Sequence, residues 1–200
     1  MTKKIIITLS IIALFASCTK ASGNNSATHD EGVVINGVRW ATRNVDMPGT
    51  FAETPECFGM LFQWNRKKAW NAVDEYVEDW DRTNATGTKW YVKKDPCPQG
   101  WRIPTREESQ SLDKAGSDWT TQNSVYGRLF GVVPHQIFLP AAGWRYHSDG
   151  ALINVGADGD YWSSTGGGRF AMRLWFGSGS SYVSSNYRAF GFSVRCVSIN

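Results

Sequence analysis

The chain has 200 residues, with 20% charged and 14% aromatic residues and a formal net charge of +3. This length suits one domain with a sizeable core. Lys3 and Lys4 supply two of the positive charges, and the +1 that remains without them gives no sign of a nucleic-acid-binding surface. Ten tryptophans and 20 glycines favour a loop-rich, aromatic-packed domain over a helical bundle.

The N-terminal segments occur in the order that is typical of an export signal. Two lysines precede an apolar run at residues 5–16, which is too short to span a bilayer. The segment 14–18, Leu-Phe-Ala-Ser-Cys, resembles a lipobox, where signal peptidase cuts before a lipid-bearing cysteine. We therefore expect residues 1–17 to be a cleaved signal peptide and Cys18 to be the lipidation site. A plain secretory signal, favoured by the atypical Phe15, and a buried N-terminal helix are the alternatives.

The segment after the signal predicts a flexible tether. Residues 18–32 are rich in Ser, Asn, Gly and Ala and have no apolar periodicity. Residues 33–200 then form the folded domain. A lipid on Cys18 would make the membrane a partner of this protein. It would place the domain in the cell envelope, on the outer membrane and exposed at the surface.

The cysteines predict one disulfide. With Cys18 lipidated, Cys57, Cys97 and Cys196 remain, an odd number in an oxidising compartment. One disulfide and one free thiol is the simplest solution. We favour Cys97–Cys196, which would join the middle of the domain to its last strand. Closing so long a loop stabilises by about 4–5 kcal/mol in the chain-entropy model. Cys57 is then expected to be a buried thiol.

The first half of the domain predicts short strands and loops. Asn36-Gly37 lies between β-rich runs and indicates a hairpin. Residues 47–56 are expected to be a loop, and residues 58–64 a strand or short buried segment. Residues 66–90 are expected to be irregular and to cover part of the core. Their acidic residues lack the spacing of a calcium loop and favour a solvated face.

One helix is well marked in the second half. Thr105 and Glu108 have capping-box spacing, so we expect a helix from Arg106 to about Ala115, closed by Gly116. Residues 136–140 predict a short apolar strand. Residues 142–197 predict short aromatic strands separated by turns, two of them at 148–150 and 158–160.

Several segments together resemble a known family, the Fibrobacter succinogenes major paralogous domain. The likeness covers about Val33 to Asn200 and implies an α+β, C-type-lectin-like domain, related to the formylglycine-generating-enzyme fold. Such a domain would have short antiparallel strands, about two helices, much irregular loop and paired termini, which agrees with a Cys97–Cys196 bond. The segments that carry the likeness are residues 36–45, 95–105, 138–145, 159–164 and 191–197.

The last forty residues also resemble the variable region of a diversity-generating retroelement target. Residues 161–164 and 191–195 match its fixed frames. A retroelement of this kind changes the adenines of asparagine codons such as AAC. All the amino acids at 166–170 and 177–187 can arise from AAC in this way, whereas Met172 and Trp175 cannot. The alternative is a Gly/Ser-rich hairpin in an ordinary paralogue. A nearby reverse transcriptase gene with a near-copy of the 3′ coding end would distinguish the two.

The composition of this region suits binding. Tyr, Ser, Gly and Asn dominate paratopes, and Trp, Tyr and Arg dominate binding hot spots. Strand alternation makes either Trp175 or Phe176 a core residue, and Trp162 is expected in the core. The expected ligand-binding residues are Arg169, Phe170, Arg173, Trp175, Ser178, Ser180, Tyr182, Ser184, Asn186 and Tyr187.

Motifs for catalysis or metal binding are missing from the sequence. No histidine pair has metal-ligand spacing, and no nucleophile elbow, phosphate loop or dinucleotide fingerprint occurs. The related formylglycine-generating enzymes use a cysteine pair near the C-terminus, where Cys196 stands alone, and the calcium-lectin motifs are also missing. We expect no enzyme activity, no cofactor and no metal.

The sequence thus predicts a surface lipoprotein that binds an unknown external protein or glycan through its C-terminal surface. Nucleic acid is not an expected partner. Two alternatives stay open. One is a structural or fimbria-associated surface lipoprotein without a variable site. The other is calcium-independent carbohydrate binding on aromatic platforms such as Trp144 and Tyr146.

Overall fold

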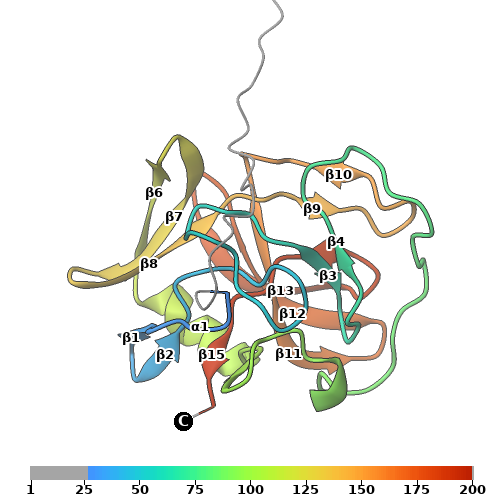
Figure 1. The fold of residues 1–200 in the computed structure, drawn as a ribbon, viewed down its shortest axis with the longest axis horizontal. Helices are drawn as coiled ribbons and strands as arrows, with labels where there is room; N and C mark the ends of the chain where they lie inside the picture. Colours follow the sequence, from blue (N-terminus) through green and yellow to red (C-terminus); the bar gives the residue numbers. More distant parts are fainter. Residues whose placement is uncertain (1–26, 200) are drawn as a thin grey trace, which may run out of the picture.

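The computed structural model describes residues 27–199, and their regular structure is mostly β (Figure 1). The strands form four antiparallel sheets, accompanied by one α-helix and one short 3-10 helix, η1 (Val92–Lys94). The predicted α+β, C-type-lectin-like fold with about two helices is therefore wrong, because only one segment of these residues has both a helix cap and a helical apolar face. The predictions for residues 1–17 and for Cys18 fall outside the described residues.

The two ends of the domain meet in one sheet. Asn36 and Gly37 have φ of 49° and 80° and form the hairpin turn that the Asn-Gly pair predicts. The last strand then pairs with the second strand of this hairpin, at Val197 and Trp40. The sheet contains, in order, β1 (Val33–Ile35), β2 (Val38–Trp40), β15 (Val197–Ser198) and β5 (Trp101–Arg102).

The cysteines confirm one prediction and correct another. Cys97 and Cys196 form a disulfide across 99 residues of sequence, with their Cα atoms 6.0 Å apart. This bond joins the segment before β5 to the segment before β15. Cys57 is also disulfide-bonded, so the prediction of a free thiol there is wrong.

Helix α1 (Arg106–Lys114) confirms the predicted capping box. The Glu108 amide donates to Thr105 Oγ1 at 3.2 Å, and the Thr105 amide donates to Glu108 Oε2 at 2.7 Å. Arg102 of β5 donates two further bonds to the Glu108 carboxylate, at 2.8 and 2.6 Å. The start of the helix is therefore tied both to its own cap and to the sheet that joins the chain ends.

A second sheet contains a hairpin that the sequence did not predict. Asn123 and Ser124 both have positive φ and turn the first strand into the second. The third strand confirms the apolar strand expected at 136–140. The sheet consists of β6 (Ser117–Gln122), β7 (Val125–Val132) and β8 (His135–Pro140).

The central sheet gathers short strands from distant parts of the chain. Leu61 and Phe62 in its middle are fully buried, which confirms the buried segment expected at 58–64. The segment 66–90 was expected to be irregular; it contains a two-residue strand (Ala69–Trp70), and only the part from residue 71 is irregular and lies beside this sheet (Figure 1). The strand order is β10 (Leu152–Ile153), β9 (Trp144–Arg145), β14 (Gly191–Phe192), β3 (Leu61–Gln63) and β4 (Ala69–Trp70).

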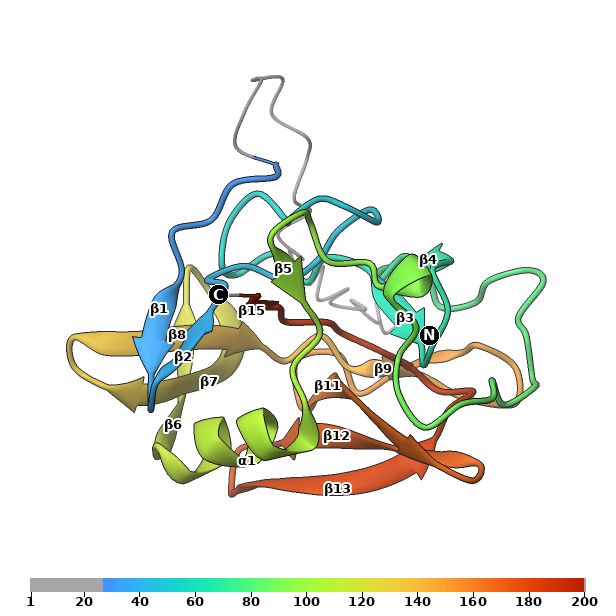
Figure 2. The same ribbon diagram turned by 90° about the horizontal axis from the view of Figure 1, so that it is seen from below.

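The C-terminal third forms a meander of longer strands than predicted: β11 (Gly159–Gly167), β12 (Phe170–Phe176) and β13 (Ser181–Tyr187). The turn expected at 158–160 lies at 155–157 instead, and Gly159 begins β11 because its backbone packs against the Phe176 ring. Helix α1 covers one face, where Leu112 packs with Leu174 and Phe176 (Figure 2). The opposite face is therefore left to meet the central sheet.

The helix cap yields a stability prediction. In the Thr105→Ala variant the Glu108 amide loses its acceptor, so we expect the free energy of unfolding to fall by about 1 kcal/mol. Urea unfolding measures the change. Thr105→Ser keeps the hydroxyl and should lose much less. Equal losses in the two variants would show that the hydroxyl is not the stabilising group.

Candidate functional site

A cleft of about 110 Å³ opens where the β11–β13 sheet meets the central sheet. Strands β11, β12 and β13 supply one wall, and β9, β14 and the residues beside them supply the other. The cleft contains five aromatic side chains and three polar ones, so it can combine stacking with directional hydrogen bonds. The aromatic residues are Trp144, Tyr146, Trp175, Phe190 and Phe192, and the polar residues are Asp160, Arg173 and Asn186.

Five of the ten predicted binding residues lie on this face. Arg173, Trp175 and Asn186 line the cleft directly. Tyr182 lies opposite Trp175 in the β12–β13 register, with the ring centroids 4.8 Å apart, and Ser184 lies opposite Arg173. Tyr182 is 45% exposed, so its ring extends the aromatic surface beyond the cleft.

The other five lie at the two ends of the meander. Arg169 is exposed in the turn between β11 and β12, next to Phe170, whose ring lies 4.8 Å from that of Tyr187. Ser178 and Ser180 are exposed in the turn between β12 and β13. The predicted residues are therefore spread along the meander, as a strip of which only the middle lies in the cleft.

Alternation along β12 decides which neighbouring aromatic residue is in the core. Phe176 is fully buried on the α1 side, whereas Trp175 faces the cleft. Trp162 is also fully buried, as expected, and its indole Nε1 donates to the Phe62 carbonyl at 2.7 Å. Trp162 therefore joins the two sheets behind the cleft and offers no surface to a ligand.

A buried ion pair forms the polar base of the cleft. Arg173 Nη1 lies 2.9 Å from Asp160 Oδ1, and the two side chains are 11% and 3% exposed. Burial raises the pKa of Asp160 to about 7; Asp158 adds to this rise and the charge of Arg173 opposes it. Arg173 Nε is buried and has no hydrogen-bond partner among the described residues. The ion pair with Asp160 therefore holds the Arg173 guanidinium in place, while its Nε group is left without a hydrogen bond.

Aromatic contacts fix the opposite wall. The Arg173 guanidinium lies over the Phe192 ring, 5.7 Å from its centroid, and Phe190 stacks beside Phe192 at 5.5 Å. Tyr146 meets Phe190 edge-on at 5.5 Å. Because each ring contacts its neighbour, the wall is preformed and does not need a ligand to order it.

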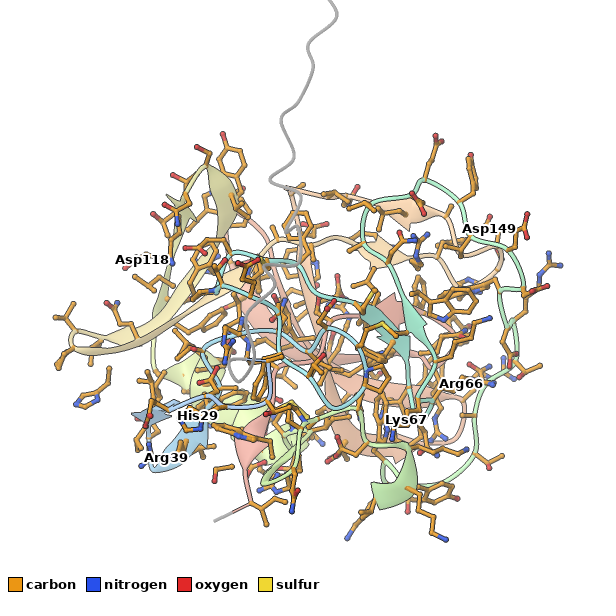
Figure 3. All side chains as sticks on the ribbon, in the orientation of Figure 1. His29, Arg39, Arg66, Lys67, Asp118 and Asp149 are labelled. Atoms are coloured by element: carbon orange, nitrogen blue, oxygen red, sulfur yellow. A yellow bond between two sulfur atoms is a disulfide. The ribbon has the colours of Figure 1, made fainter. Side chains whose placement is uncertain are left out.

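The turn that carries Tyr146 is held by a buried arginine. Arg145 is fully buried, and its guanidinium donates to the Gly150 carbonyl at 2.6 Å and to the Asp74 carbonyl at 2.9 Å. Asp149 in this turn points to the periphery of the molecule (Figure 3). The irregular segment around residue 74 and the edge of the cleft are thus fixed by one side chain.

Sequence reasoning missed part of this site. Asp160 was placed in a turn, although a charged residue beside Tyr161 and Trp162 in a buried strand signals a paired or functional carboxylate. The sequence assigns Phe192 to the fixed frame 191–195 and gives no signal for Phe190. Trp144 and Tyr146 were named only for the carbohydrate alternative, and they line the same cleft as the predicted binding residues.

Two negative findings concern the described residues alone. Residues 27–199 contain no group of three or more His, Cys, Asp or Glu that could hold a metal ion. No helix among them is long and apolar enough to cross a membrane.

The profile of a family described as a domain of unknown function (DUF8237) matches residues 115–197. The chain is similar to that family from the end of α1 to β15, and every residue that lines the cleft lies within the match. Neither a curated protein nor a solved structure gives a significant match.

The buried carboxyl yields a pH prediction. The pKa of Asp160 is about 7 in the folded chain and about 4 in the unfolded chain. The folded chain therefore keeps this proton up to a higher pH than the unfolded chain does. The contribution of Asp160 to stability is therefore lost as the pH rises from about 4 to 7. We expect Asp160→Asn to gain stability relative to wild type between pH 4 and pH 8, measured by urea unfolding. Exposed Asp118→Asn is the control; an equal gain there would contradict the assignment.

Proposed function

We propose that this protein is a lipid-anchored cell-envelope protein that binds an external ligand through the cleft and the adjoining face of β12 and β13. The observation that carries the proposal is the grouping of Arg173, Trp175 and Asn186 with a preformed aromatic wall. These three residues, which the sequence predicts to bind a ligand, line one concave site. A structural or fimbria-associated lipoprotein without a ligand is the alternative.

The physical properties of this face suit recognition. Trp175 and Tyr182 offer large, rigid contact areas that lose little conformational entropy on binding. Ser184 and Asn186 offer hydrogen-bonding groups beside them. The cleft is small, so it would accept one side chain or one sugar ring of a larger ligand, while the strip from Arg169 to Ser178 contacts the rest.

A protein ligand is our first candidate, because the strip along the meander is extended and rich in Tyr and Ser. A saccharide is the second candidate, favoured by Trp144 and Tyr146 at the cleft. Aromatic rings pack against the apolar faces of sugars, and carboxylate, guanidinium and amide groups bond sugar hydroxyls in pairs. Diversification by a retroelement stays a prediction and is not required by either candidate.

Binding arrays test the proposal. We expect the mature protein to bind selected members of a printed protein array or of a glycan array. Trp175→Ala and Tyr182→Ala should each weaken that binding about 30-fold, as loss of a 2 kcal/mol hot spot does. Tyr126→Ala removes a similarly exposed ring (52% exposed, on β7) and should leave binding unchanged.

The array that is bound, and the variants that lose binding, distinguish a protein ligand from a saccharide ligand. If only glycans bind, and Trp144→Ala abolishes binding, the saccharide candidate is correct. Equal effects of the Tyr182 and Tyr126 substitutions would move the site elsewhere. Binding to neither array in repeated trials would favour the structural alternative.

The anchor is tested separately. We expect the mature wild-type protein to partition into the detergent phase and to carry labelled palmitate, and the Cys18→Ala variant to do neither. Mass spectrometry of the N-terminal peptide should find a thioether-linked diacylglycerol on Cys18. A Cys18 sulfur engaged in a disulfide instead would contradict the anchor, since one sulfur cannot form both bonds.

A further inference from the structure

Strand β13 forms the outer edge of its sheet. The strand order is β11-β12-β13, and no other strand of the described chain pairs with the far side of β13. Figure 2 shows β13 at the margin of the molecule, with α1 against the face of the sheet and not along this edge. The strand has seven residues, none of them buried. A long open edge of this kind presents backbone groups to solvent.

The hydrogen-bond pattern identifies these backbone groups. Two hydrogen bonds fix the β12–β13 ladder at its ends: the Gly177 amide donates to the Ser180 carbonyl at 3.0 Å, and the Arg188 amide donates to the Arg169 carbonyl at 3.2 Å. The register between them has no shift. Bonded pairs alternate in an antiparallel ladder, so the backbone of Tyr182, Ser184 and Asn186 faces β12.

The backbone of the intervening residues, Ser181, Val183 and Ser185, must therefore point outward. Their amide and carbonyl groups have no backbone or side-chain partner among the described residues. Three consecutive outward positions leave three donors and three acceptors in one row. That row matches the free edge of another strand.

This edge lacks the devices that usually block pairing. β13 contains no charged residue, no proline and no bulge. Strand β6, which is an edge of the β6–β8 sheet, is less open than β13. It carries exposed Asp118, and Arg128 Nη2 donates to its Ser117 carbonyl at 3.3 Å. Of the two, β13 is the edge left open.

We propose that β13 pairs antiparallel with β13 of a second copy of this chain, about a two-fold axis at Val183. The outward positions are symmetric about Val183, so Ser181 of each copy meets Ser185 of the other, and the two Val183 residues meet at the axis. Three such pairs exchange about six hydrogen bonds. No like charges meet, since the strand is uncharged. The contact is self-complementary, as a two-fold dimer requires.

The dimer has a consequence for binding that rests on the proposed function. A two-fold axis perpendicular to the joined sheet keeps equivalent faces on the same side. Both clefts then open on one face of a six-stranded sheet, with both α1 helices on the other. Two clefts facing one way would bind a multivalent ligand far more tightly than one.

Sedimentation of the mature protein in detergent solution tests the pairing without any ligand. We expect a concentration-dependent monomer–dimer equilibrium. Ser185→Pro removes one outward amide and no β12–β13 bond, so it should shift the protein to monomer while its circular dichroism and melting temperature stay close to wild type. Thr121→Pro, at an outward position of the β6 edge, is the matched control and should leave the dimer intact.

A crosslinking experiment tests the register. Ser181→Cys and Ser185→Cys variants should form an intermolecular disulfide when mixed, and neither should do so alone. A wild-type protein that stays monomeric at all concentrations would overturn the proposal, as would a dimer that survives Ser185→Pro. Loss of ligand binding by a Trp175→Ala protein that still dimerises would concern the proposed function alone.

Discussion

Three buried arginines bind together the parts of this domain that have no regular structure. Arg145, Arg188 and Arg195 are each at most 1% exposed, and each guanidinium donates to backbone carbonyl groups of distant segments. A guanidinium offers five donors in a fixed plane, so it can satisfy carbonyls that no strand or helix reaches. Burial lowers the pKa of Arg195 to about 10, which still leaves it charged at neutral pH. The long loops depend on these donors for their position.

Two of these arginines, Arg145 and Arg188, support the walls of the cleft. Arg145 fixes the turn that presents Tyr146, and Arg188 ties the Phe170 carbonyl of β12 to the Ala85 carbonyl at 3.0 and 2.6 Å. Arg188 also lies over the Trp64 ring, 4.2 Å from its centroid. The aromatic walls therefore sit on rigid supports. Arg173 differs from the three supporting arginines, because it faces the cleft with a carboxylate partner and an unbonded Nε.

Local rules predicted the elements whose signals are local. The Thr105 capping box and the Asn36-Gly37 turn are confirmed because both depend on a few adjacent residues. The β6–β7 hairpin was missed because Asn123-Ser124 is a weaker turn signal than Asn-Gly. Asp160 was missed because only the folded chain brings Arg173 to it. The family likeness misled the fold prediction, since it implied a second helix that residues 27–199 do not contain.

In the two proposals, strand β13 uses its side chains for ligand binding and its backbone for pairing with a second copy. The side chains of Tyr182, Ser184 and Asn186 extend to the cleft face, while the outward backbone groups belong to Ser181, Val183 and Ser185. Backbone pairing tolerates most side chains except proline. Substitutions at the cleft positions would therefore change which ligand binds without removing the edge. A strand arranged this way can vary its recognition chemistry while the contact between copies stays the same.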